Sequence, residues 1–346
     1  MIITKEALLR IARDTVVKRT EGENEGSDIL SIYLTGSLLG DDPLMGNSTD
    51  IDLVFVHSES PSIGREIVRL SPEIHLDIKH NPREEYEPAR DLRMNPWLGP
   101  EIYSAVQLYD PEHFFDFVQA AVRDRYHDPL NAHARANLNE EHARGIWEDL
   151  TADAINKTHF HPKSFLRYLK SVNHAANTLT VIKGSILGER RFLLEFPAFA
   201  EGYELPELGG ELYSLLGAGQ LQQSNLEDML SAWEKNFIKV SMDNSVDARL
   251  HPTRVVYYQR GFETMLSEGT PGAILWPLLH TWSLAASKLP KEEQSAWEDA
   301  CQSLGMLSEG MTSNLERLDI FLDKLEQLLE EWKNKHGLSD SIQGET

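Results

Sequence analysis

Two aspartates, one residue apart, are the strongest candidates for chemistry in this sequence. Asp50 and Asp52 begin the segment 50–57, in which apolar residues such as Ile51 and Leu53 alternate with them and predict a β-strand. Successive side chains on a strand point to opposite faces, so both carboxylates project to one side, about 6.5–7 Å apart along the backbone. Converging carboxylates suit a hard divalent cation such as Mg²⁺. The spacing therefore predicts a metal site at the start of this strand.

A Gly-Ser pair precedes these aspartates. Residues 29–34 predict a buried strand that ends at Gly36-Ser37, and the turn-rich segment 40–49 leads on to Asp50. Glycine allows a close approach of the backbone, while the serine hydroxyl and free N–H groups can bind a phosphate. Phosphates over one element and metal ligands on its neighbour suit phosphoryl or nucleotidyl transfer. Either feature alone is common in ordinary turns and strand edges, and their combination in this order favours function.

The combined segment resembles the signature of the DNA polymerase β-like nucleotidyltransferases. That signature has an apolar residue, Gly, Gly or Ser, roughly ten residues, and then Asp, apolar, Asp or Glu, apolar, which Leu34 to Ser37 and Asp50 to Leu53 match. The resemblance covers residues 29–111 and implies two Mg²⁺ ions at the aspartates, with ATP or another nucleoside triphosphate as substrate. It also implies that Gly36 and Ser37 hold the phosphates. It is specific for the superfamily and does not identify the acceptor.

A third carboxylate is expected from a later strand in this family, and Asp77 is the best match. Residues 74–78 predict a strand whose apolar residues face away from Asp77. Glu73 and His75 share its face, so a neighbour is the alternative, and an ordinary polar residue on an edge strand is another. The resemblance implies a joint role for Asp77 as metal ligand and general base. The sequence from Val106 to Pro111 also resembles the end of the catalytic domain in these enzymes.

Strand patterns occupy the first third of the chain, and helical patterns follow. This order predicts an α+β fold, in which an N-terminal mixed sheet of nucleotidyltransferase type with flanking helices precedes an all-α domain. We place the catalytic domain at residues 1–125, the helical domain at 126–336 and a flexible tail at 337–346. Within the first domain, residues 61–70 have the composition of a short helix.

A basic segment stands out in the helical domain. Residues 154–194 hold seven Lys or Arg and one acidic residue, Glu189. Lys163, Arg167, Lys170, His174 and Asn177 follow helical spacing, beside an apolar stripe that starts at Phe165. Lys or Arg residues from the helical domain reach the triphosphate in enzymes that resemble this one, so Arg167 and Lys170 are candidate nucleotide ligands. A solvated helix face is the equally weighted alternative.

Charge and composition restrict the partners. With 33 Lys and Arg against 55 Asp and Glu, the net charge of −22 repels polyanions and disfavours nucleic acid. The single Cys301 excludes disulfides within the chain and Cys-based zinc sites. We expect a cytoplasmic protein with no membrane segment, because no apolar run approaches the length of a bilayer span. The last helix has a leucine stripe that packs within its domain or against a second copy, so monomer and homodimer remain open.

The leading hypothesis is an enzyme that transfers a nucleoside monophosphate, most simply AMP from ATP, to a hydroxyl of a small molecule. The layout is similar to that of the aminoglycoside adenylyltransferases, and a cationic antibiotic suits an acidic site. Two other classes compete with it. One comprises nucleotidyltransferases that act on tRNA or, as in toxin neutralisation, on a partner protein. The other is a regulator that binds nucleotide without turnover.

Overall fold

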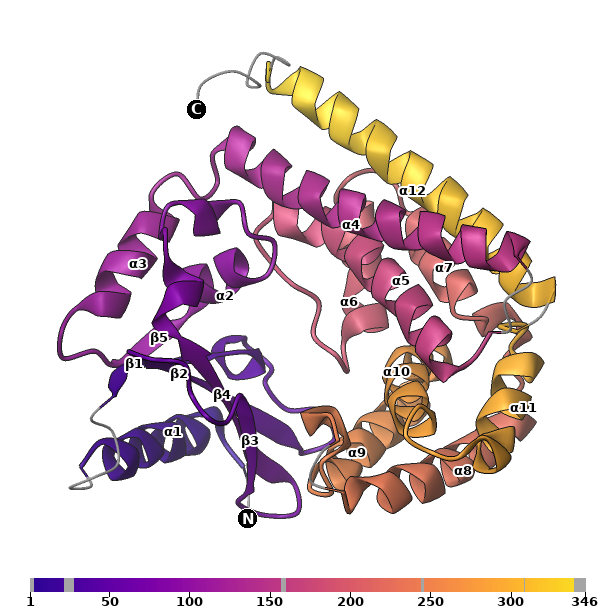
Figure 1. The fold of residues 1–346 in the computed structure, drawn as a ribbon, viewed down its shortest axis with the longest axis horizontal. Helices are drawn as coiled ribbons and strands as arrows, with labels where there is room; N and C mark the ends of the chain where they lie inside the picture. The colour runs from indigo at the N-terminus through magenta and orange to yellow at the C-terminus, as the bar shows by residue number, and fades with distance from the viewer. Residues whose placement is uncertain (1–2, 22–27, 157–159, 244–245, 308, 339–346) are drawn as a thin grey trace. The chain divides into compact units, whose positions relative to one another are not determined.

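The protein folds into two compact units. The computed structural model describes residues 3–21, 28–156, 160–243, 246–307 and 309–338 (Figure 1). The first unit comprises Met1–Tyr126 and His251–Glu268, and the second comprises His127–Leu250 and Gly269–Thr346. The segment His251–Glu268, which the sequence analysis assigned to the helical domain, thus groups with the sheet. Of the expected tail, residues 339–346 lie outside the described part of the chain.

The first unit combines one sheet with helices. Its elements, in chain order, are α1 (Lys5–Thr20), β1 (Ile29–Thr35), η1 (Ser37–Leu39), β2 (Thr49–His57), β3 (Arg65–Arg69), β4 (Ile74–Pro82), η2 (Arg83–Tyr86), η3 (Asp91–Arg93), α2 (Leu98–Ser104), β5 (Val106–Tyr109), α3 (Phe114–Arg123) and α9 (Arg254–Ser267). The five strands have the order β3-β4-β2-β1-β5, with β2 and β4 parallel and the other neighbours antiparallel. This is the mixed sheet that the sequence predicts.

The sequence analysis predicted a short helix at residues 61–70, and this prediction is wrong. Residues Arg65–Arg69 form the edge strand β3, which pairs antiparallel with β4. The β-branched Ile67 and Val68 favour a strand, and Ile67 lies opposite Asp77 in the pairing. In so short a segment the helical and strand patterns could not be separated by apolar spacing, and the long-range pairing decides.

The two faces of the sheet pack against different helices. Leu8, Ala12 and Val16 of α1 pack with the apolar residues of one face, including Ile51 and Leu53. The opposite face packs with α2, α3 and the connection before α2, and its core contains Tyr33, Val54, Val56, Tyr86, Ile102, Phe115 and Val118. Strand alternation places the side chains of Asp50 and Asp52 on this second face, because Ile51 and Leu53 occupy the first.

Helix α9 completes the first unit. Its Tyr257 ring meets the His75 ring of β4 edge to face, with centroids 5.3 Å apart. The backbone carbonyl of Arg260 lies so close to Gly46, in the loop before β2, that a β-carbon there would overlap it. Gly46 has a φ of 60°, which also favours glycine. These two contacts, both made by residues after Arg254, therefore hold α9 against β4 and this loop.

Among its described residues, the second unit contains helices and their connections and no strand. Its α-helices are α4 (Pro129–Ile155), α5 (Pro162–Ile182), α6 (Phe192–Glu201), α7 (Glu207–Leu215), α8 (Gln223–Ser241), α10 (Leu275–Ala286), α11 (Ser295–Ser303) and α12 (Glu309–Lys335). The leucine stripe of α12 is buried within this unit, at Leu318, Leu322, Leu325 and Leu329. Helix α12 runs beside α4 (Figure 1), where Arg144 pairs with Asp319, Asp323 and Glu326.

The secondary structure confirms the predicted α+β class, with a sheet at the N-terminal end followed by a run of helices. Among the described residues, none of the helices combines the length and the apolar character needed to span a bilayer.

Candidate active site

The pairing of β1 and β2 brings the Gly-Ser turn to the aspartates. Thr35, the last residue of β1, lies opposite Asp52 in this antiparallel pair. The chain then turns at Gly36, with a φ of 77°, into the short helix η1. Ser37 Oγ lies 3.5 Å from Oγ1 of Thr49, the residue that precedes Asp50 in the sequence. The end of one strand and the start of the next therefore place a glycine, a serine and two carboxylates together.

Strand register also brings the third carboxylate to the same place. Asp52 and Asp77 are direct partners across the parallel strands β2 and β4, and Asp50 is the partner of His75. One oxygen from each of Asp50, Asp52 and Asp77 lies within 4.8 Å of the others. Asp50 and Asp77 are buried, and Asp52 is half-buried. The structure thus gathers all three aspartates that the sequence analysis selected.

Crowding of these carboxylates affects the acidity of Asp52. Burial and the charge of Asp50 raise the pKa of Asp52 well above its usual value, while Arg254 and Arg65 oppose the rise. Concentrated negative charge in a desolvated place is unfavourable unless cations accompany it. The cations are therefore as much part of the site as the aspartates.

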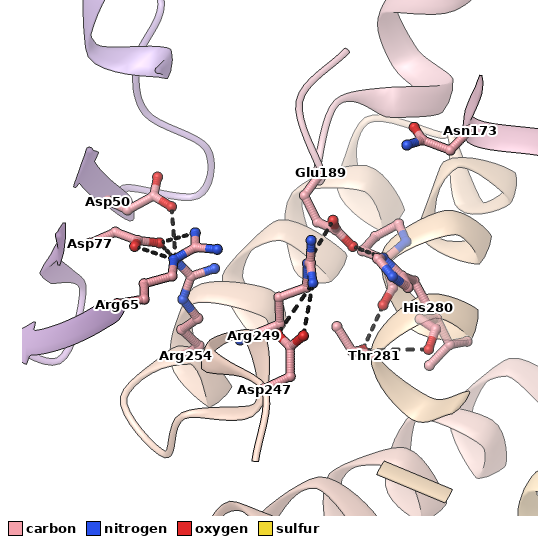
Figure 2. A network of polar contacts seen from close by, with 12 residues as sticks. Asp50, Arg65, Asp77, Asn173, Glu189, Asp247, Arg249, Arg254, His280 and Thr281 are labelled. Carbon is pink, nitrogen blue, oxygen red and sulfur yellow. Dashed lines mark hydrogen bonds and ion pairs between the residues drawn. The ribbon is translucent and has the colours of Figure 1, made fainter. Parts of the chain in front are cut away.

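Two arginines supply positive charge, and both bind Asp77 (Figure 2). Arg65 of β3 donates from Nε to Asp77 Oδ1 and from Nη2 to Asp77 Oδ2, each at 2.6 Å. Arg254 of α9 contacts Asp77 Oδ2 through its Nη2, which also lies 3.6 Å from Asp50 Oδ2. The Arg254 side chain is 5% exposed and that of Arg65 is 37% exposed. Arg254 is therefore an internal group, whereas Arg65 closes the edge of the sheet.

The donor set fits a divalent cation of the Mg²⁺ type. Its three side chains are all carboxylates, the hard oxygen ligands that such ions prefer, and their oxygens converge. Three carboxylate charges against two guanidinium charges leave the cluster with a deficit of positive charge. Asp50 and Asp52 would hold the cation, and Asp77 would share it with its arginines.

Polar side chains continue from the triad along the same face of the sheet. Tyr33 of β1 donates to Glu101 Oε1 at 2.7 Å and lies 2.8 Å from the hydroxyl of Tyr86. Asn81 of β4 donates to that Tyr86 hydroxyl at 3.0 Å. The charge of Glu101 contributes to the raised pKa of Asp52. Through Tyr86, these hydrogen bonds link β1 to β4, the strand that carries Asp77.

Comparisons with known proteins do not assign the chain to a family. The chain matches no protein-family model and no curated protein. Among solved structures it is similar to the crystal structure of a nucleotidyltransferase-like protein from Exiguobacterium sibiricum 255-15, at 11% identity over 97% of this chain and 96% of that chain. The TM-score of 0.32 is too low to support a conclusion about this protein. Activity is therefore inferred from the residues of the site.

Sequence reasoning missed Arg65 and Arg254. Arg65 fell in the segment expected to be a helix, so its hydrogen bonds to Asp77 could not be anticipated. Arg254 begins a helix of ordinary composition in the region assigned to the helical domain. An arginine at the start of a helix gives no local signal for a distant carboxylate, because only tertiary packing joins them. The adjacent β-branched residues Ile67 and Val68 were the one available clue that Arg65 begins a strand.

The candidate phosphate ligands of the basic segment lie in the second unit, on α5. Arg167 pairs with Asp149 at 3.0 Å and with Asp153 at 2.9 Å. Lys170 is exposed and makes no ion pair within the described residues. His174 and Asn177 of the expected polar stripe are buried, so the stripe is not one continuous solvent face.

Lys157 and Glu189 also belong to the basic segment. Lys157 lies outside the described residues. Glu189, the acidic residue of the segment, pairs with His280 at 2.8 Å and Arg249 at 3.7 Å within the second unit (Figure 2).

Proposed function

We propose that the first unit catalyses divalent-cation-dependent transfer of a nucleoside monophosphate from a nucleoside triphosphate to an acceptor hydroxyl. The supporting observation is the convergence of Asp50, Asp52 and Asp77 within 4.8 Å beside the Gly36-Ser37 turn. A carboxylate cluster alone would be weak support. Its combination with a turn that can approach phosphates is what nucleotidyl transfer requires.

In the proposed reaction, the acceptor oxygen forms a bond to the α-phosphorus of the nucleotide. The bond from that phosphorus to the oxygen bridging to the β-phosphate breaks, and pyrophosphate leaves. Gly36 and Ser37 hold the phosphates through backbone N–H groups and the Ser37 hydroxyl. Asp50 and Asp52 would hold up to two Mg²⁺ ions, which would neutralise phosphate charge and help to ionise the acceptor hydroxyl.

The ion pairs of Asp77 restrict its use as a proton acceptor. Both of its oxygens accept guanidinium hydrogens from Arg65, and Arg254 contacts one of them. A carboxylate that holds two guanidinium groups gains little from a proton, because protonation would weaken both ion pairs. Asp77 can accept the hydroxyl proton only after one arginine has moved, so its role as a ligand is better supported than its role as a base.

We further propose ATP as the nucleotide and a small cationic molecule, of the aminoglycoside kind, as the acceptor. The net charge of −22 favours such an acceptor and disfavours tRNA. A partner protein remains an alternative acceptor, because net charge does not count against it. We expect a cytoplasmic monomer or homodimer that needs no membrane.

The test is a screen for pyrophosphate release and label transfer from α-labelled nucleoside triphosphates with Mg²⁺. Acceptors are aminoglycosides, tRNA and cell lysate, and Asp52→Asn is the matched inactive control. Transfer to an aminoglycoside by the wild type alone supports the proposal in full, and transfer to tRNA or a lysate protein replaces its acceptor. Turnover that is equal in wild type and Asp52→Asn would show that the activity does not belong to this site.

One observation favours the regulatory alternative. Arg254 and Arg65 already neutralise much of the charge of the triad, as in a binding module that retains the fold without turnover. Nucleotide binding without pyrophosphate release for any acceptor would favour this second function.

A further inference from the structure

The Nη2 atom of Arg254 lies between two of the three carboxylates (Figure 2). It contacts Asp77 Oδ2 and is 3.6 Å from Asp50 Oδ2. The guanidinium is buried, with 5% of the side chain exposed, so solvent does little to screen its charge. It is therefore a strong electrostatic partner of the two aspartates.

A divalent cation on the same aspartates would need this space. Mg²⁺ lies about 2.1 Å from its oxygen ligands and Mn²⁺ takes similar oxygen ligands, so an ion shared by Asp50 and Asp77 would be within contact distance of Arg254 Nη2. Two positive groups cannot occupy adjoining positions in a desolvated site without a large cost. The guanidinium and the cation therefore compete for these two carboxylates.

We propose that Arg254 is a displaceable internal counter-ion of the triad, which a divalent cation must move in order to bind. The proposal rests on the proposed function to the extent that the triad is a cation site. In the cation-free protein Arg254 holds Asp50 and Asp77 together and limits their repulsion. When a cation binds, the guanidinium leaves Asp77, and that carboxylate becomes available as a ligand.

The packing of α9 makes this displacement a movement of the side chain. The helix is held by the contact of Arg260 with Gly46 and by the ring contact of Tyr257 with His75. Neither contact is made by the Arg254 guanidinium, which itself lies over the Tyr257 ring with its Cζ 5.7 Å from the ring centroid. Displacement therefore does not require α9 to leave the sheet.

Arg65 differs from Arg254 in its partners and in its exposure. Its two hydrogen bonds go to Asp77 alone, and its side chain is 37% exposed at the sheet edge. It can stay on the outer side of Asp77 while a cation binds between the carboxylates. The competition should therefore depend on Arg254 more than on Arg65.

The experiment measures Mn²⁺ affinity by calorimetry, without nucleotide, in the full chain. Arg254→Gln removes the competing charge and should tighten Mn²⁺ binding about ten-fold or more. This size is expected because a cation beside a carboxylate weakens its proton affinity to a similar extent. Arg260→Gln is the matched control on the same helix. It removes the same charge from an exposed residue paired with Glu263, and should change the affinity by less than about two-fold.

Arg254→Lys is a second variant that tests the proposal if Arg254→Gln does not fold. It keeps a buried positive charge with a shorter reach and should give an affinity between those of wild type and Arg254→Gln. Thermal melting gives a second readout, because Mn²⁺ should raise the Tm of Arg254→Gln more than that of wild type. Equal or weaker Mn²⁺ binding by both Arg254 variants would overturn the proposal.

The outcomes separate this inference from the proposed function. Tighter Mn²⁺ binding by Arg254→Gln, together with no nucleotide transfer by wild type, supports the counter-ion and rejects the enzyme. Nucleotide transfer by wild type with unchanged Mn²⁺ affinity in the variants rejects the counter-ion alone. Absence of Mn²⁺ binding in every protein rejects the counter-ion, and it rejects the enzyme as well if the wild type transfers no nucleotide.

Discussion

The backbone of Gly36 lies directly against the carboxylate of Asp52. A β-carbon on Gly36 would overlap Asp52 Oδ2 and come within 2.7 Å of Asp52 Cγ. The backbone at Gly36, with φ 77° and ψ −161°, lies in a region that is almost restricted to glycine. The turn that follows β1 and the carboxylate of Asp52 in β2 therefore depend on each other, and glycine is needed for both the conformation and the space.

We expect Gly36→Ala to lose nucleotide transfer and some stability. The strained backbone costs about 1–3 kcal/mol, and the methyl group forces Asp52 away from the other carboxylates. Gly64→Ala is the control, because its β-carbon would meet open space in the same unit. Thermal melting and pyrophosphate release measure the two effects. Normal turnover by Gly36→Ala would separate Asp52 from the reaction.

Asp52→Asn tests the carboxylate itself. It should lower transfer about a hundredfold or more, because the charge that holds the cation is lost. The Tm should stay the same or rise slightly, since burial and Asp50 raise the pKa of Asp52 and make its charge unfavourable in the fold. Asp41→Asn, in the exposed loop before β2, removes the same charge and should affect neither property. Transfer near the wild-type rate in Asp52→Asn would contradict the assignment.

The aspartates were accessible to sequence analysis because their signal is local. The two-residue period of a strand places Asp50 and Asp52 on one face, whatever their surroundings are. The same period selected Asp77 within its own strand. Its position beside Asp52 depends on the pairing of β2 with β4, which no local pattern encodes. A family resemblance supplied that link.

The arginines were inaccessible for the opposite reason. Arg65 depends on a five-residue edge strand that is too short for its period to be distinguished from that of a helix. Arg254 depends on the return of His251–Glu268 to the first unit after the greater part of the helical region has been completed. Charged residues at helix starts are frequent, so only the folded structure connects Arg254 with Asp77.

The basic face of α5 offers a third test. Lys170 is exposed and has no ion pair within the described residues, whereas Arg167 is shared between Asp149 and Asp153. If this face binds the triphosphate, Lys170→Ala should weaken ATP binding by about 1.5–3 kcal/mol, the scale of a charge-assisted hydrogen bond. Arg167→Ala should weaken it less, because its charge is already compensated. Calorimetric titration of ATP and AMP checks this, and unchanged ATP affinity in Lys170→Ala would leave the face with a structural role.

The last prediction concerns the stability of the second unit at acidic pH. His174 is buried on α5, with its Nδ1 3.0 Å from Asn139 Oδ1 and its ring 5.2 Å from that of His142. Burial, helped by the charges of His142 and Lys170, lowers the pKa of His174 to about 4. The unfolded chain binds a proton at this histidine near pH 6.5, so it takes up the proton before the folded chain does. The stability that comes from neutral His174 is therefore complete above about pH 6.5 and is lost as the pH falls towards 4.

Between about pH 7.5 and 5, His174 should cost the wild type up to about 2 kcal/mol of unfolding free energy, and His174→Gln should not lose this amount. Glu140 acts in the opposite direction, because burial raises its pKa to about 7 and its protonation favours the folded state as the pH falls. The difference between wild type and variant cancels this contribution, since Glu140 is present in both. Urea unfolding followed by tryptophan fluorescence suits the measurement, because six of the seven tryptophans lie in the second unit. As a control, His142→Gln, which changes the exposed neighbour, should keep most of the wild-type pH dependence. An identical pH dependence in wild type and His174→Gln would show that His174 does not titrate in this range.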